Sequence, residues 1–223
     1  MAGRPPSTRP RKPRKLSPRF IVACEGRKTE YNYFTILDKA LKRGQRAAFC
    51  FLRGKGGTAG DVVDRALEQR DDDKREGKFF PADGDRVYAV IDVEPHDPTK
   101  EQPLQQALDR ASKHDVTVLL SNPSFEVWLL CHVSTAAEMK HAFASPGEVD
   151  ELLKKRFGKG KDELNANPHA YGKLDERARN AILVAQEVHQ QHHGGCDDLR
   201  DANACTEVYR LVEYMLGQTD EPP

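Results

Sequence analysis

The fold of this chain is decided by the stretch Arg-Phe-Ile-Val-Ala-Cys-Glu-Gly, residues 19–26. Its first six residues form a nearly continuous apolar run with β-branched side chains, a pattern typical of a strand buried on both faces. Glu25 and Gly26 end this run abruptly, so we expect a tight turn there. Strands buried on both faces occur mainly in parallel sheets whose two sides are covered by helices.

Working outward, the first 132 residues alternate between strand and helical patterns. Further strands are expected at 47–52, 86–91 and 116–120, and helices at 30–43, 60–77, 103–112 and from 123 onward. Thr29 is expected to cap the first helix, and Asn122 followed by Pro123 is expected to open the fourth. The alternation predicts an α/β fold with a mostly parallel sheet flanked by helices.

After residue 133 we find no good strand pattern. Ser145 and Glu148 form a capping box before one helix, a polar loop follows at 158–172, and further helices are expected at 173–191 and 206–216. The chain is therefore expected to have three parts. These are a disordered basic tail at 1–18, an α/β domain at 19–132 and a helical C-terminal part at 133–223, packed on the sheet.

The charges of the chain are unevenly distributed. The 223 residues contain 35 basic and 35 acidic residues, yet residues 1–19 hold seven basic residues and no acidic one. This tail is also rich in proline, and such a segment cannot bury a core. Two interpretations stay open, namely an arm that binds phosphates without specificity and a solubilising leader on an acidic body.

Composition excludes several classes of protein. No apolar run approaches the roughly 18–20 residues that span a bilayer, and no apolar core follows the basic N-terminus as it does in a secretory signal. The five cysteines include no Cys-x-x-Cys pair. We therefore expect a cytoplasmic protein with reduced thiols, three of them in apolar segments, and with no membrane association.

Acidic side chains follow two of the expected strands. Glu25 leaves the first strand, and Asp92 and Glu94 leave the third. Because ligands bind at the carboxyl ends of parallel strands, these carboxylates are expected to converge on one edge, where a cation such as Mg²⁺ or Mn²⁺ would offset their repulsion. The alternative is that acidic residues merely end strands at the surface.

Four blocks of sequence resemble one known family. Residues 20–34, which contain Glu25-Gly26 and Thr29-Glu30, are similar to the opening motif of the RloB-like family. Residues 88–96, 121–132 and 203–212 resemble its later blocks. The family is related to abortive infection and resembles the Toprim fold of topoisomerases, primases and OLD-type nucleases.

The resemblance implies a Toprim-like fold and a Mg²⁺-dependent, nuclease-like effector of anti-phage defence. It also implies an ABC-type ATPase partner from the same defence locus and a nucleic-acid substrate, either DNA or RNA, with tRNA as one candidate. Glu94 departs from the family pattern, which usually has Asp there, and this puts efficient catalysis in doubt. Asp97 could replace Glu94 as a metal ligand.

Roles for single residues follow from the resemblance and from phosphodiester chemistry. Asp92 and Glu94 would hold the metal, and Glu25 would transfer a proton or bind a second ion. Glu126 would either add an acidic ligand or interact with a helix dipole. His96 is a candidate acid–base group or phosphate contact, whereas His132 lies in an apolar stripe and is expected to be a buried, hydrogen-bonded histidine.

Several residues are expected to contact the nucleic acid, either through a Gly-rich turn or through a basic segment. They are Gly26, Arg27, Lys28, Lys55, Lys161 and Lys173. The segment around Lys55 lacks the order of a phosphate loop, so nucleotide triphosphate binding is rejected there, and a flexible turn is its other interpretation. A solvated helix face is the alternative for Lys161 and Lys173.

Three further alternatives stay open. His189, His193 and Cys196 have a spacing that could ligate zinc, although no fourth ligand is evident. The protein could act as a catalytically weak adaptor that binds a defence ATPase rather than as an enzyme. A primase-like nucleotidyl transferase is less favoured, since no nucleotide-binding segment is evident. Homo-oligomerisation is left open.

Overall fold

We describe the chain from a computed structural model. It describes residues 17–41, 47–93, 98–139, 143, 145–158, 174–193, 200 and 202–223. Nearly all of the basic tail, residues 1–16, lies outside this set, so its role stays a prediction.

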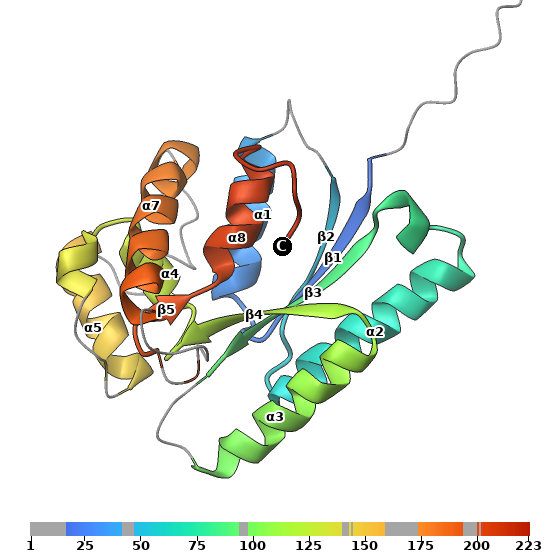
Figure 1. Cartoon of the computed structure of the whole chain (residues 1–223), viewed down its shortest axis with the longest axis horizontal. Helices are drawn as coiled ribbons and strands as arrows, with labels where there is room; N and C mark the ends of the chain where they lie inside the picture. The colour runs from blue at the N-terminus through green and yellow to red at the C-terminus, as the bar shows by residue number, and fades with distance from the viewer. Residues whose placement is uncertain are drawn as a thin grey trace, which may run out of the picture.

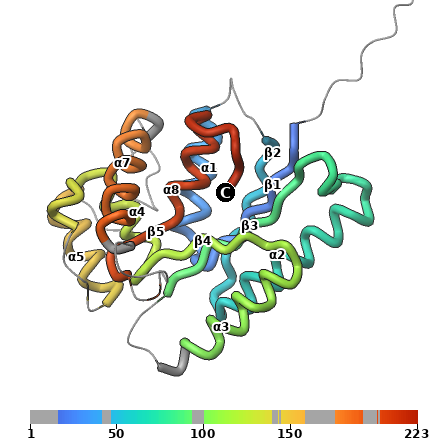
Figure 2. The backbone as a smooth tube through the Cα atoms, viewed as in Figure 1, coloured from blue at the N-terminus to red at the C-terminus, as the bar shows by residue number. Residues whose placement is uncertain are grey.

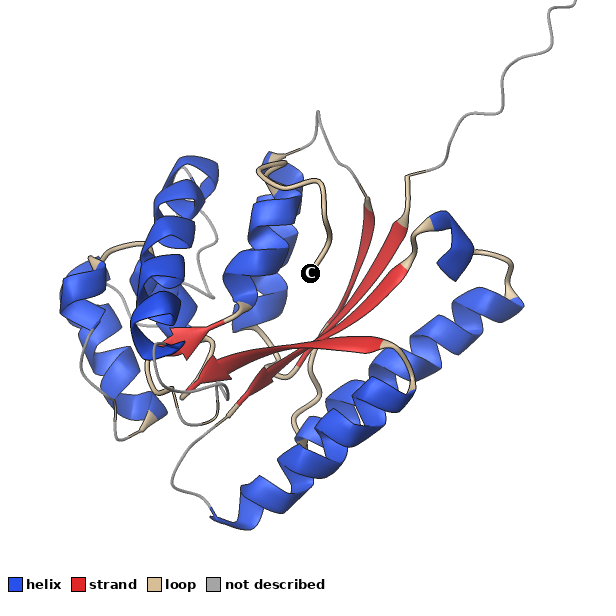
Figure 3. Cartoon of the chain, viewed as in Figure 1, coloured by secondary structure: helices blue, strands red, loops and turns tan. Residues whose placement is uncertain are grey.

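The centre of the protein is one five-stranded sheet, which Figure 3 shows as a twisted layer between helices. The strand order is β2-β1-β3-β4-β5, and all neighbours are parallel except β4 and β5. The strands are β1 (Arg19–Cys24), β2 (Ala48–Leu52), β3 (Arg86–Asp92), β4 (Val116–Asn122) and β5 (Cys205–Thr206). The prediction of an α/β fold with a mostly parallel sheet is thereby confirmed.

Helices cover both faces of the sheet (Figure 1). On one face lie α2 (Ala59–Arg75) and α3 (Pro98–Lys113), which run side by side in Figure 2. On the other lie α1 (Thr29–Ala40) and α8 (Val208–Met215). Beyond these are α4 (Glu126–Cys131), α5 (Pro146–Phe157) and α7 (Leu174–His193), with short 3-10 helices η1 (Pro81–Asp83) and η2 (Ala136–Met139). Within the described ranges, no helix has the length and apolar character needed to cross a membrane.

The strand that predicted the fold is also the centre of the core. Phe20, Ile21, Val22 and the two residues after them have no solvent-exposed surface. Phe20 packs on Tyr88 of β3 and stacks on Tyr214 of α8, with ring centroids 5.3 and 5.1 Å apart. Burying side chains of this size stabilises the fold by roughly 1.5–3 kcal/mol each, so β1 anchors both layers of helices.

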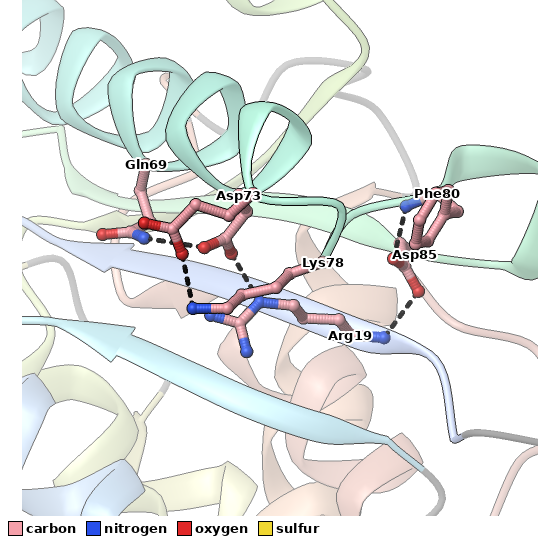
Figure 4. A network of polar contacts seen from close by, with 7 residues as sticks. Arg19, Gln69, Asp73, Lys78, Phe80 and Asp85 are labelled. Carbon is pink, nitrogen blue, oxygen red and sulfur yellow. Dashed lines mark hydrogen bonds and ion pairs between the residues drawn. The ribbon is translucent and has the colours of Figure 1, made fainter.

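A polar network ties the amino end of β1 to the neighbouring elements (Figure 4). The Arg19 guanidinium donates to the buried Asp73 carboxylate of α2, which also accepts a bond from Gln69. The two oxygens of Asp85 accept the backbone N–H groups of Arg19 and Phe80, both at 2.7 Å. Every buried charge in this network therefore has partners, as burial requires.

The thiols at the core are reduced. Cys24, Cys131 and Cys205 are buried and free, and Cys50 is half-buried and free. The expectation of unpaired thiols is confirmed for these four residues, and that of burial for all of them except Cys50, while Cys196 lies outside the described residues.

Two predicted helix starts were wrong. Lys28 is at the N-cap of α1 and no side chain caps the helix, because Thr29 is already its first residue. Asn122 is the last residue of β4, and the N-cap of α4 is Phe125. Asn122 instead donates its side-chain amide to the carbonyl of Arg200, so it serves a long-range contact rather than the helix.

The prediction of no strand after residue 133 was also wrong. The two-residue strand β5 pairs antiparallel with the end of β4. It is held by a 2.8 Å hydrogen bond between the hydroxyl groups of Ser121 and Thr206 and by a bond from Glu207 N–H to the Leu120 carbonyl. Two residues are too short to give a periodic pattern, and the pairing depends on the free edge of β4.

Candidate active site

The carboxyl ends of β1 and β3 bring two predicted residues into direct contact. Pairing of these strands continues one residue past β1, where Glu25 N–H bonds to the carbonyl of Val90. The backbone N–H of Asp92 in turn donates a 2.9 Å hydrogen bond to Oε2 of Glu25. The expectation that Glu25 and Asp92 converge at one sheet edge is thus met by the structure.

Asp92 also organises the turn that leads into α4. Its Oδ1 accepts the backbone N–H of Phe125 at 2.9 Å. The next residue, Glu126, is the first residue of α4 and is only 5% exposed. Asp92 therefore links β3 both to Glu25 and to the segment that carries Glu126.

A fourth carboxylate, Glu30, was missed by the sequence analysis as a site residue. It lies in the first turn of α1, is only 3% exposed, and its Oε1 accepts the backbone N–H of Gly26 at 2.7 Å. A Cβ atom placed on Gly26 would lie 2.1 Å from Oε2 of Glu30. The absence of a side chain at Gly26 is thus what admits Glu30 to this turn.

Neighbouring carboxylates raise the pKa of two members of this cluster, Asp92 and Glu30. Loss of hydration raises the pKa of Asp92 well above its ordinary value. The negative charges of Glu30, Glu126 and Glu25 raise this pKa further, in that order, and the bond from Phe125 N–H opposes the shift. The surroundings of Asp92 thus favour its protonated form.

Glu30 shows the same effect with a pKa near neutrality. Burial raises the pKa of Glu30 from 4.5 to about 7. The hydrogen bond from Gly26 N–H lowers this pKa, whereas the charges of Glu126 and Glu25 raise it. A buried carboxyl group of this kind carries a proton for part of the time at neutral pH.

The donor chemistry of this cluster fits a hard divalent cation. Carboxylate oxygens are the ligands that Mg²⁺ prefers, and Mg²⁺ usually keeps several waters and takes only one or two protein carboxylates. In the part of the chain that the structure describes, no set of three or more Asp, Glu, His or Cys side chains is arranged as a metal cage. The predicted ligand Glu94, its substitute Asp97 and the candidate His96 lie outside that part.

A Gly-rich loop packs directly against the Glu25–Gly26 turn. Gly54 N–H bonds to the carbonyl of Gly26 at 3.0 Å, and a Cβ on Gly54 would lie 2.0 Å from the carbonyl oxygen of Glu25. The loop also accepts a 3.0 Å bond from Arg27 Nε to the carbonyl of Lys55. The loop is therefore joined to the turn through the backbone of Gly54 and through the Arg27 side chain, which bonds to the carbonyl of Lys55.

The rim of the site is basic. Arg27, Lys28, Arg53 and Lys55 are all exposed. The Arg53 guanidinium lies 4.4 Å from the ring centroid of Tyr31 in α1, a cation–π contact that the sequence analysis did not foresee. The other predicted nucleic-acid contacts, Lys161 and Lys173, fall in the segment that the structure leaves undescribed.

The expectation for His132 is confirmed. Its Nδ1 bonds to the carbonyl of Trp128 at 2.9 Å, and its Nε2 is 3.2 Å from the hydroxyl of Tyr33. Since a carbonyl can only accept, Nδ1 carries the proton and Nε2 accepts from Tyr33. Burial lowers the pKa of His132 to about 4, so this histidine is neutral and structural.

One of the residues predicted as a possible zinc ligand, His189, makes an aromatic contact. The ring of His189 packs against Tyr209, with centroids 5.8 Å apart. The structure describes only the backbone of His193, and Cys196 lies outside the described residues, so the zinc site stays a prediction.

Comparison with known proteins gives one result. The sequence model of the family described as RloB-like protein matches residues 20–215. No curated protein and no solved structure matches the chain.

Proposed function

Since this chain belongs to the RloB-like family, we propose that it is a Mg²⁺- or Mn²⁺-dependent, nuclease-like effector of anti-phage defence with a Toprim-like fold. The observation that carries the proposal is the contact of Glu25 with Asp92 beside Glu30 and Glu126, at the edge of a parallel sheet where such folds bind ligands. The family assignment supports the link to defence, and the carboxylate cluster supports the metal-dependent chemistry.

Asp92 is proposed as the central metal ligand, with Glu25 and Glu94 completing the set. When bound, the cation would stabilise the negative charge that develops on a phosphodiester under attack and would lower the pKa of an attacking water. Backbone N–H groups position both carboxylates: the N–H of Phe125 donates to Asp92, and the N–H of Asp92 donates to Glu25. Such preorganisation limits the reorganisation that a reaction would require.

Proton transfer is proposed for Glu25, with His96 and Glu126 as further candidates. Glu25 is half-buried at the turn and its Oε2 is oriented by the Asp92 N–H. Glu126 is almost fully buried. Burial hinders direct contact of this carboxylate with the reacting group, but its charge can still act on the pKa values of the neighbouring carboxylates.

A nucleic-acid substrate is supported by the arrangement of opposite charges. The carboxylates lie in the buried turn, while Arg27, Arg53 and Lys55 lie on the exposed loops beside it. Basic side chains attract the phosphate backbone, and the charged cluster would then face a single phosphodiester. The substrate is proposed to be DNA or RNA, with tRNA as one candidate, and an ABC-type ATPase of the same locus is the proposed partner.

A cleavage assay tests this function. Purified protein is incubated with labelled duplex DNA, single-stranded DNA and tRNA, with Mg²⁺, with Mn²⁺ or with EDTA. We expect cleavage of at least one substrate that EDTA and Asp92→Asn both abolish. Cleavage that persists in EDTA, or in folded Asp92→Asn protein, would contradict the proposal.

The second candidate function is an adaptor that binds the defence ATPase without cleaving nucleic acid. It is favoured by one observation, the Glu at position 94 where the family usually has Asp. The adaptor requires no metal chemistry, so phage protection by folded Glu25→Gln protein would favour it over the nuclease.

A further inference from the structure

The opposite end of the sheet contains a cavity that the proposed nuclease does not use. Its volume is about 460 Å³, and it lies between the C-terminal halves of α2 and α3 and the first residues of β3 and β4. Arg86, the first residue of β3, lines it, whereas Asp92 is the last residue of the same strand. At about 3.3 Å per residue the two are roughly 20 Å apart, so this is a separate place on the molecule.

One side of the cavity is cationic. It is lined by Arg70, Lys74, Arg86 and His114. Arg70 is held in place by a 2.8 Å bond from Nη1 to the His114 carbonyl and by an ion pair with Asp71. By contrast, neither Lys74 nor Arg86 forms an ion pair with a carboxylate in the described ranges. Lys74 Nζ lies 5.9 Å from the ring centroid of Phe79, and Arg86 donates one bond, at 2.9 Å, to the carbonyl of Asp85, so each has N–H groups left for an anion.

Two carboxylates, Asp85 and Asp115, offset part of this charge. Both oxygens of Asp85 are already occupied by the N–H groups of Arg19 and Phe80, as Figure 4 shows. Asp115 is the other carboxylate of the lining. The C-termini of α2 and α3 lie here too and disfavour an anion, but by less than 1 kcal/mol each at an exposed end. The lining thus holds three permanent cations against two carboxylates, and Lys74 and Arg86 are the cations with no carboxylate partner among the described residues.

The other side of the cavity is apolar and preformed. Phe79, Val87 and Val116 line it and are themselves buried in the core. Asp85 fixes this wall, since its two bonds connect the segment before β3 to the start of β1. A volume of this size falls within the roughly 300–1,000 Å³ of small-molecule sites, which combine apolar walls with a few polar groups.

We propose that this cavity binds a small organic phosphate that carries a flat apolar group, the chemistry of a mononucleotide. The phosphate contacts Lys74 and Arg86, because ammonium and guanidinium groups are suited to binding phosphate. The flat group lies against Phe79 and the two valines. The site is independent of the proposed nuclease, because no carboxylate of the metal cluster lines it.

This site is tested by calorimetric titration of the full chain with AMP. The titration is done in EDTA, so that no metal-dependent binding contributes. We expect saturable binding of AMP, with at least tenfold weaker binding of both adenosine and inorganic phosphate, because each lacks one half of the recognised chemistry. Lys74→Ala and Arg86→Ala are expected to weaken AMP binding at least tenfold. Lys113→Ala is the matched control, since Lys113 ends the neighbouring α3 but lines a different hollow, and it should bind AMP like the wild type.

A second variant tests the cavity without removing a charge. Ser112 is an exposed residue of α3 that lines the cavity, so Ser112→Trp would occupy the space and should block AMP in a folded protein. The proposal is overturned if AMP gives no heat or if Lys113→Ala weakens binding as much as Lys74→Ala. Unchanged binding by folded Ser112→Trp, or inorganic phosphate or adenosine binding as tightly as AMP, would overturn it as well.

Discussion

The backbone N–H of Asp92 donates a 2.9 Å hydrogen bond to Oε2 of Glu25, across 67 residues of sequence. This contact joins the ends of two adjacent parallel strands and orients one carboxylate of the cluster by the backbone that carries another. Because strand pairing positions both residues, the contact is expected to form before any ligand binds. It makes the carboxyl edge of the sheet a preorganised acidic site.

Metal should stabilise the wild-type protein through Asp92. We expect Mg²⁺ or Mn²⁺ to raise the melting temperature and to give measurable heat in calorimetry, because a cation offsets the loss of hydration and the carboxylate repulsion that together raise the pKa of Asp92. Asp92→Asn should lose most of this response. Equal heats and equal shifts for the two proteins would refute a metal site at Asp92.

Glu25→Gln should separate catalysis from stability. The change removes a charge and a proton acceptor but keeps the size of the side chain and an oxygen that can accept the Asp92 N–H. We expect cleavage and phage protection to be lost while the melting temperature in EDTA stays level or rises slightly, since one of several like charges is removed. Glu151→Gln, at an exposed position of α5, is the control and should change neither quantity.

Gly54→Ala should destabilise the fold at the site. Its Cβ would lie 2.0 Å from the Glu25 carbonyl oxygen and 2.3 Å from that of Gly26, so the backbone of one loop must move. We expect a loss of about 2–3 kcal/mol in the free energy of unfolding, measured by denaturant titration. In Gly60→Ala the new Cβ meets only Thr58 Oγ1 at 3.5 Å within a helix, so stability should be unchanged or higher. Equal effects of the two changes would contradict the close packing of the loop.

Glu30 should make stability depend on pH. Its pKa in the folded protein, about 7, lies above the ordinary 4.5, so the fold favours the protonated form. This contribution to stability is complete below pH 4.5 and is lost as the pH rises through 7. In EDTA, the wild type should therefore lose on the order of 2–3 kcal/mol relative to Glu30→Gln between pH 4.5 and pH 8. Parallel stability curves for the two proteins would show that Glu30 is not perturbed.

Lys55→Ala should weaken nucleic-acid binding in a salt-dependent way. If Lys55 neutralises one phosphate, the slope of log affinity against log salt should become shallower by roughly 0.7–0.9. Lys39→Ala, an exposed change near the opposite end of α1, should leave the slope unaltered. Fluorescence anisotropy at several salt concentrations measures both, and an unchanged slope for Lys55→Ala would remove Lys55 from the interface.

Local patterns in the sequence were enough for the main architecture. The apolar run at β1 and the alternation after it predicted a mostly parallel α/β sheet, because burial on both faces leaves a signal in a few adjacent residues. The positions of Glu25 and Asp92 predicted their convergence, because the carboxyl ends of adjacent parallel strands lie at the same edge of a sheet. The four sequence blocks identified the RloB-like family, which the match over residues 20–215 confirms.

The tertiary structure decided which further side chains lie beside Glu25 and Asp92. Glu30 had the pattern of an ordinary first-turn helix residue, and only the fold of the Gly26 turn buries it and raises its pKa to about 7. Asn122 had the pattern of a helix cap, yet the Arg200 carbonyl takes its amide, and β5 exists only because β4 offers a free edge. Such features depend on contacts between residues far apart in the chain. Side-chain burial and hydrogen-bond partners are set by those contacts, and no local periodicity encodes them.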